Sequence, residues 1–273
     1  MVGNSTTLPA VSGVIEADDA RLHFDSVGTG QPVVFIHAGV ADSRMWNAQF
    51  EEIEGARLIR FDLRGYGKSS LGSQRFTNRD DVISVLDHLE IGRALLVGCS
   101  IGGNIALQVA ASAPARLDGL VLVGADAPGF DPGVDYESPE WPLAVEAFKA
   151  GDWKRVAELD AEMWLAGRGR TRSDLDPETV DLFVSMDLTA LENETARNEL
   201  DDGERLERLP EVDVPVEVIV GARDIPQLIA AADDLAANLG QRPPVVIEDT
   251  AHLPPMDRPL DFNSALTGFL ASI

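Results

Sequence analysis

One serine of the chain stands between two glycines at a spacing that suits nucleophilic catalysis. Residues 98–102 read Gly-Cys-Ser-Ile-Gly, and they come directly after the apolar run 94–98 and directly before a helical pattern. A nucleophile on such a strained turn needs small residues two positions before and after it, because a Cβ there would clash with neighbouring backbone. We therefore predict that Ser100 projects from the end of a strand and attacks a substrate.

Four histidines could supply the base that a serine hydroxyl requires. His252 follows the apolar run 244–248, in a loop at the carboxyl end of a predicted strand, where open α/β sheets assemble their sites. The other three are expected to be structural, with His37 shaping the loop after the first buried strand; they are His23, His37 and His88. We therefore predict that His252 is the general base.

A carboxylate must orient that imidazole. Asp224 follows the apolar run 214–221 and completes the chain order Ser, Asp, His that this serine motif predicts. Asp126 is a rival, because it follows the run 117–124 at another strand end, and Asp249 is a third candidate. We predict that Asp224 has this role.

Backbone NH groups are expected to stabilise the oxyanion that forms when a serine attacks a carbonyl. The Ile101 NH lies next to the nucleophile at the start of a helix. The second donor is expected from the loop after the run 32–37, where Gly39 lets the main chain approach the substrate. Val40 replaces Gly39 if the loop is shifted by one residue.

Four residues are candidates for contact with the substrate. Arg44 and Trp46 follow the loop of Gly39, with an ion pair and a buried indole as the alternative interpretation. Trp164 and Met186 belong to helical patterns and are expected to line a pocket beneath a lid, the alternative being packing onto the sheet.

Short apolar runs alternate with helical patterns at the spacing of βα units. Fully apolar strands suit a parallel sheet that is covered on both faces. Residues 13–27 predict a hairpin at its edge. The predicted buried strands are 32–37, 58–63, 94–98, 117–124, 214–221 and 244–248.

The strand rhythm stops between residues 126 and 209. Prolines interrupt the first part of this segment, and helical patterns follow at 143–165 and 177–200. We predict a helical insertion at 126–209 between two parts of one α/β core, residues 1–125 and 210–273. A last helix at 259–270 is expected to cover the sheet.

Composition excludes several classes of function. The formal net charge of −24 would repel nucleic acid and anionic membranes. One cysteine, Cys99, cannot form an intramolecular disulfide or a thiolate metal site, and we expect it to be buried. The uncharged stretch 94–115 is punctuated by glycines and polar residues, so it predicts a strand and helix instead of a membrane span. Without a signal-peptide pattern, a cytoplasmic location is expected.

The sequence resembles the α/β-hydrolase superfamily over nearly its whole length. Five landmarks carry the resemblance in order: His37-Ala38-Gly39, Asp62 to Ser69, the turn around Ser100, Gly221 to Asp224, and Ala251-His252-Leu253. The resemblance implies an α/β fold with a mostly parallel, eight-stranded sheet, a helical cap and a Ser-Asp-His triad without cofactor or metal. Ala38 departs from the glycine of many relatives.

The resemblance also narrows the chemistry. Ser100 stands where haloalkane dehalogenases and epoxide hydrolases carry Asp, and Leu253 stands where carbon-carbon bond hydrolases often carry Trp. The tail is closer to small-ester and enol-lactone hydrolases. We therefore predict hydrolysis of a small to medium carboxylic ester or lactone through an acyl-enzyme, by a monomer or homodimer.

Three alternatives stay open at this point. The first is a carbon-carbon bond hydrolase that acts on a vinylogous diketone, and the second is a haloperoxidase-like enzyme without cofactor. The third is a ligand receptor on the same fold. An apparently complete triad disfavours the receptor.

Overall fold

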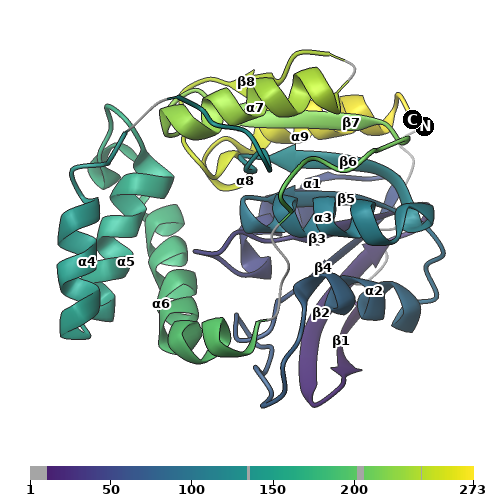
Figure 1. Cartoon of the computed structure of the whole chain (residues 1–273), viewed down its shortest axis with the longest axis horizontal. Helices are drawn as coiled ribbons and strands as arrows, with labels where there is room; N and C mark the ends of the chain where they lie inside the picture. The colour runs from purple at the N-terminus through teal and green to yellow at the C-terminus, as the bar shows by residue number, and fades with distance from the viewer. Residues whose placement is uncertain (1–10, 134–135, 202–205, 241) are drawn as a thin grey trace, which may run out of the picture.

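An eight-stranded sheet forms the centre of the molecule, with helices on both of its faces (Figure 1). The computed structural model describes residues 11–133, 136–201, 206–240 and 242–273. The strand order is β1-β2-β4-β3-β5-β6-β7-β8, in which β2 is antiparallel to both of its neighbours and the other pairs are parallel. The expected α/β fold with a mostly parallel sheet is confirmed. The strands are β1 Val11–Ala17, β2 Ala20–Gly28, β3 Gln31–Ile36, β4 Ala56–Phe61, β5 Ala94–Cys99, β6 Leu117–Val123, β7 Val216–Gly221 and β8 Val245–Ile247.

The central strands are apolar throughout because both faces of the sheet are buried. Successive residues of β5 alternate between the two cores: Leu96 belongs to one hydrophobic cluster, and Leu95 and Val97 belong to the other. Helices α2, α3 and α7 pack on the first face, whereas α1 and α9 pack on the second. The helices are α1 Asn47–Glu52, α2 Asn78–His88, α3 Ile101–Ser112, α4 Trp141–Ala150, α5 Trp153–Asp160, α6 Pro177–Leu200, α7 Pro226–Asn238, α8 Pro254–Asp257 and α9 Pro259–Leu270.

Helices α4, α5 and α6 connect β6 to β7 and lie together at one end of the sheet (Figure 1). The expected helix at 143–165 is interrupted, because Gly151 adopts a left-handed conformation (φ 71°) at the end of α4. Asp152 then caps α5 by accepting a hydrogen bond from the Arg155 NH (3.1 Å). A π-helical turn, Ala161–Ala166, follows α5.

The strand predicted at 58–63 is shifted to 56–61 in the structure. Asp62 has left the sheet, and its carboxylate accepts hydrogen bonds from the Ser43 NH (2.9 Å) and the Lys68 NH (2.8 Å). It therefore ties two loops together beyond the strand end. Across the described ranges, every helix is too short or too polar to cross a bilayer.

Candidate active site

Ser100 lies on the sharp turn between β5 and α3. Its backbone has φ 54° and ψ −118°, a strained conformation for a residue with a side chain. Its NH donates to the Val123 carbonyl (2.8 Å), which anchors the turn to β6. A Cβ on Gly98 would overlap the Gly102 carbonyl oxygen, and one on Gly102 would overlap the Ile36 carbonyl oxygen. Both glycines of the sequence motif are therefore required by close backbone contacts.

His252 and Asp224 form a buried pair at the ends of β8 and β7. The His252 Nδ1 lies 2.8 Å from Asp224 Oδ2, and the two residues are only 4% and 2% exposed. Asp224 Oδ1 accepts from the Ile225 NH (2.8 Å), which fixes the carboxylate. This geometry assigns the proton of the neutral imidazole to Nδ1 and leaves Nε2 available as a base.

Burial and the charge of Asp224 have opposite effects on the pKa of His252. Burial disfavours the charged imidazole, but the negative charge of Asp224 and its hydrogen bond outweigh this effect, so the pKa of His252 is raised. Asp126 adds a smaller contribution in the same direction. The site therefore stabilises the imidazolium that would form when His252 accepts a proton.

The segment Val123-Gly124 holds the serine and the histidine near each other. The Val123 carbonyl binds the Ser100 NH, and a Cβ on Gly124 would lie 3.0 Å from His252 Nδ1. Gly124 has φ 52°, so its lack of a side chain serves both the turn and the close approach of the imidazole. The sequence showed Gly124 only as the end of a strand.

The rival carboxylates have other partners. Asp126 is exposed and accepts a hydrogen bond from Asn104 Nδ2 (3.2 Å). Asp249 pairs with Arg223 (2.7 Å). Among the residues that the structure describes, Asp224 is the carboxylate hydrogen-bonded to the His252 ring.

The expected oxyanion donors lie side by side. A Cβ on Gly39 would lie 3.5 Å from the Ile101 side chain, and both residues line the same cavity. His37 shapes this loop as expected: its Nε2 accepts from the Leu63 NH (3.0 Å), so Nδ1 carries the proton and donates to the Ala38 carbonyl (2.8 Å). Burial lowers the pKa of His37, which keeps this ring neutral.

Cys99 is fully buried behind the serine, with its Sγ 3.6 Å from the His252 carbonyl oxygen. Burial raises the pKa of its thiol. A protonated, inaccessible thiol is a poor nucleophile, so Ser100 is the candidate that remains.

Two of the residues that the sequence suggested as substrate contacts, Trp46 and Met186, are buried away from the cavity. Trp46 is fully buried between Phe35 and Phe262, with ring centroids 5.0 and 6.0 Å away, and it does not reach the cavity. Met186 is likewise fully buried and packs from α6 onto the sheet's core. Their expected place in the pocket is wrong, because both side chains gain more from burial in these apolar clusters.

Arg44 and Trp164 have specific partners. The Arg44 guanidinium pairs with Asp42 (2.7 Å) and donates to Ser185 Oγ of α6 (3.3 Å), so its charge is neutralised outside the cavity lining. Trp164 does not line the cavity either, but its ring lies against the His252 ring with centroids 5.0 Å apart. Its carbonyl also accepts from the His252 NH (3.1 Å). Trp164 therefore braces the imidazole from the helical segment.

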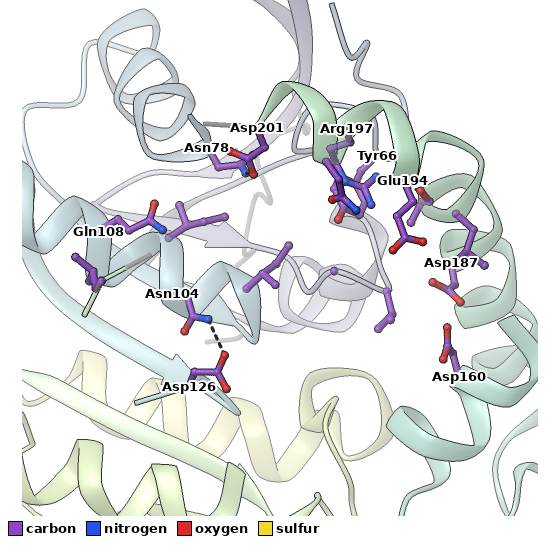
Figure 2. A pocket seen from close by; sticks show the side chains of 18 of the residues that line it. Tyr66, Asn78, Asn104, Gln108, Asp126, Asp160, Asp187, Glu194, Arg197 and Asp201 are labelled. Carbon is purple, nitrogen blue, oxygen red and sulfur yellow. Dashed lines mark hydrogen bonds between the residues drawn. The ribbon is translucent and has the colours of Figure 1, made fainter. Parts of the chain in front are cut away.

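A cavity of about 580 Å³ extends from Gly39 and Ile101 to α6 (Figure 2). Sequence reasoning missed the polar residues of its wall. The signal was available in α6, where polar side chains recur at helical spacing on one face: Asp187, Glu194, Arg197 and Asn198, with Asp201 directly after the helix. In the described part of the chain, no cluster of three or more His, Cys, Asp or Glu side chains is arranged to hold a metal ion.

Comparisons with known proteins indicate the family of the chain. A family model described as the alpha/beta hydrolase family matches residues 33–265. The AB hydrolase superfamily protein YisY of Bacillus subtilis is 29% identical over 247 residues, which cover 86% of this chain and 90% of that protein.

Two solved structures are similar in sequence and fold. Est816, described as an N-acyl homoserine lactone degrading enzyme, is 27% identical with a TM-score of 0.75 over 94% of this chain and 100% of its own. A thermophilic esterase of Thermogutta terrifontis is 27% identical with a TM-score of 0.75 over 97% of this chain and 99% of its own. Since the family model covers most of the sequence, this chain belongs to the alpha/beta hydrolase family.

Proposed function

We propose that this hydrolase cleaves a carboxylic ester or lactone of small to medium size through an acyl-enzyme intermediate on Ser100. The proposal is carried by the buried pair of His252 Nδ1 and Asp224 Oδ2, 2.8 Å apart, and by Ser100 on its strained turn, which the segment Val123-Gly124 connects to His252. The similarity to a lactone-degrading enzyme and to an esterase, over nearly the whole chain, supports the same substrate class.

The first half of the proposed reaction forms the acyl-enzyme. Ser100 Oγ attacks the carbonyl carbon while His252 Nε2 takes its proton, and Asp224 stabilises the resulting imidazolium. The NH groups of Gly39 and Ile101 stabilise the oxyanion, with each donor contributing about 3 kcal/mol in the transition state. When the tetrahedral intermediate collapses, His252 gives its proton to the leaving alkoxide.

The second half releases the acid. Water attacks the acyl carbon and loses its proton to His252, and collapse of the second tetrahedral intermediate returns that proton to Ser100. In this proposal residues 126–209 act as a cap, because α6 forms one wall of the cavity that reaches the oxyanion donors.

A fluorophosphonate tests the nucleophile without requiring the natural substrate, because it reacts with an activated serine hydroxyl. Intact mass measurement should show one adduct on the wild-type protein and none on Ser100→Ala. Ser112→Ala is the matched control. Ser112 is the last residue of α3, the helix that follows Ser100, and its hydroxyl donates to the Gln108 carbonyl (2.8 Å), so this variant should still form the adduct. Absence of an adduct on the folded wild-type protein would favour the receptor alternative.

A second assay separates the bonds that the enzyme cleaves. Simple carboxylic esters and lactones should be hydrolysed, whereas a vinylogous diketone should not. Faster cleavage of the diketone would assign the same residues to carbon-carbon bond hydrolysis. Halogenation of a test dye with peroxide and bromide, without ester hydrolysis, would favour the haloperoxidase alternative.

A further inference from the structure

Two aspartates that line the cavity face each other. Asp160 ends α5 and Asp187 lies in α6, and Figure 2 shows their carboxyl groups pointing toward one another. Both side chains are buried, with Asp160 8% exposed and Asp187 only 1% exposed. We call these two residues the acid pair. The proposed mechanism does not use them.

The acid pair holds a proton near neutral pH. Burial, followed by the charge of Asp160 and a hydrogen bond to it, raises the pKa of Asp187 to about 9. Burial is also the main cause that raises the pKa of Asp160, to about 6. Two adjacent carboxyl groups in a low-dielectric wall share one proton more readily than they carry two charges. The pair therefore presents about one negative charge.

Apart from the proton that the pair shares, one oxygen of Asp187 has no donor. Asp187 Oδ2 is buried, and none of the N–H or hydroxyl groups of the described residues donates to it. An unsatisfied buried oxygen is costly, and it is found where a ligand or water completes the site. Because Asp187 lines the cavity, a donor brought by a ligand would satisfy this oxygen.

Two amide oxygens on the opposite side of the cavity lining, from α2 and α3, are also unpartnered (Figure 2). Asn104 Nδ2 donates to Asp126 (3.2 Å) and Asn78 Nδ2 donates to Asp201 (3.0 Å), so each amide must turn its NH₂ toward a carboxylate. The Oδ1 atoms of both asparagines are then buried without partners in the described part of the chain. The unpartnered side-chain atoms among the described lining residues are thus acceptors, so the cavity suits a ligand that carries donors.

The net charge of the cavity lining also favours a ligand that carries donors. The described lining residues include five carboxyl groups but one basic side chain, that of Arg197. The Arg197 guanidinium lies over the Tyr66 ring (4.1 Å) and donates to the Ala190 carbonyl (3.1 Å), so it is already engaged. The cavity remains negative even with a proton on the acid pair, and it would repel an anionic substrate.

We propose that the acid pair is a subsite for a primary ammonium group carried by the substrate, so that the enzyme prefers esters with a cationic amine at some distance from the scissile carbonyl. A primary ammonium brings one positive charge and three N–H donors, which match one negative charge and an unpartnered oxygen. The acid pair and the oxyanion donors share one cavity of about 580 Å³, so one medium-sized molecule reaches both. This inference rests on the proposed ester hydrolysis.

Matched substrates test the subsite. We compare 4-nitrophenyl 6-aminohexanoate with 4-nitrophenyl heptanoate, which has the same number of chain atoms but no charge. The 8-aminooctanoate and nonanoate esters test a longer reach, and 6-aminohexyl butanoate with heptyl butanoate places the charge on the alcohol. In at least one pair, kcat/KM of the wild-type enzyme should be about tenfold or more higher for the amine, mainly through a lower KM.

Variants locate the preference. Asp187→Asn and the double change Asp160→Asn with Asp187→Asn should reduce the amine-to-neutral ratio of kcat/KM about tenfold or more. A loss of activity that affects both esters equally cancels in this ratio. Asp181→Asn is the matched control, because Asp181 is an exposed aspartate of the same helix, and it should leave the ratio unchanged. If a variant does not fold, inhibition of the wild-type enzyme gives a second test: hexylammonium should compete with the neutral ester more strongly than hexan-1-ol does.

The outcomes separate the two proposals. Equal kcat/KM within every substrate pair, or a preference that survives in both acid-pair variants, would overturn the subsite while ester hydrolysis stands. No hydrolysis of any ester, together with no fluorophosphonate adduct, would instead overturn the proposed function.

Discussion

At the level of single residues, Asp224 determines which nitrogen of His252 holds a proton. Its Oδ2 lies 2.8 Å from Nδ1, and an amide in its place would offer no comparable charge and could favour the wrong tautomer. We expect Asp224→Asn to lower kcat by about 10,000-fold with little change in fold. Ester hydrolysis and circular dichroism measure the two effects.

Asp126→Asn is the matched control for that change. Asp126 follows the neighbouring strand but hydrogen-bonds Asn104 instead of His252. We expect kcat of the Asp126→Asn variant to stay within a few-fold of the wild-type value. A large loss in Asp126→Asn with near wild-type activity in Asp224→Asn would exchange the roles of the two carboxylates.

The raised pKa of His252 predicts the acidic limb of the pH profile. In the proposed mechanism His252 must be neutral to accept the Ser100 proton, so kcat/KM should rise as the pH rises through the pKa of His252. This pKa lies above the ordinary value of 6.5, because Asp224 and, more weakly, Asp126 stabilise the imidazolium against the effect of burial. The profile of kcat/KM should give a midpoint above 6.5, and Asp126→Asn should move it down slightly. A midpoint below 6.5 would contradict this assignment.

The positions of Ser100, Asp224 and His252 could be predicted because each follows an apolar strand, and the carboxyl ends of parallel strands meet at one edge of the sheet. The burial of Trp46 and Met186 could not be predicted in the same way. Both are apolar residues near the site, and whether such a side chain faces a core or a cavity depends on partners distant in sequence, such as Phe262 for Trp46. The acid pair was missed for the same reason, since Asp160 and Asp187 come from different helices.

At the level of elements, the turn between β5 and α3 depends on close backbone contact. A Cβ on Gly102 would overlap the Ile36 carbonyl oxygen, and neither β3 nor β5 has room to move within the sheet. We expect Gly102→Ala to lower the free energy of unfolding by about 2 kcal/mol or more, as for other overpacked sites. Chemical denaturation measures this change.

Gly268 provides the opposite case in another helix. It lies inside α9, and a Cβ there would meet nothing within 4 Å. Because alanine loses less backbone entropy than glycine in a helix, Gly268→Ala should raise the free energy of unfolding by about 0.5–1 kcal/mol. If Gly102→Ala raises the free energy of unfolding as Gly268→Ala does, the close contact at Gly102 is not what requires a glycine.

The sheet was more predictable than the helical segment. Strands such as β5 are apolar on both faces, and that pattern is local. The break between α4 and α5 depends on a glycine inside a helical pattern, which a helix often tolerates, so Gly151 alone did not mark an end. The helix at 177–200 was predicted with its observed bounds, because Asp176 and Pro177 form a strong start signal.

At the level of the whole molecule, the charge of the surface and that of the cavity have the same sign. The chain carries 46 acidic and 22 basic residues, and the lining of the cavity repeats this excess with five carboxyl groups and one arginine. A negative field of this extent raises the local concentration of cations and lowers that of anions near the cavity entrance. The proposed preference for ammonium esters is therefore consistent with the field that a substrate meets before it binds.

The same excess of charge opposes folding, because like charges lie closer together in the compact state. We expect the melting temperature to rise by several degrees between 0.1 and 1 M NaCl, as the screening length falls from about 10 to 3 Å. A variant with Glu51, Glu192 and Asp233 all changed to Lys should show a smaller rise, since these three exposed acids contribute to the repulsion. Thermal unfolding of both proteins in the two buffers measures the difference. A melting temperature that falls with salt would contradict this prediction. It would mean that attractive ion pairs such as Arg223-Asp249 (2.7 Å) stabilise the fold more than the repulsion between like charges destabilises it.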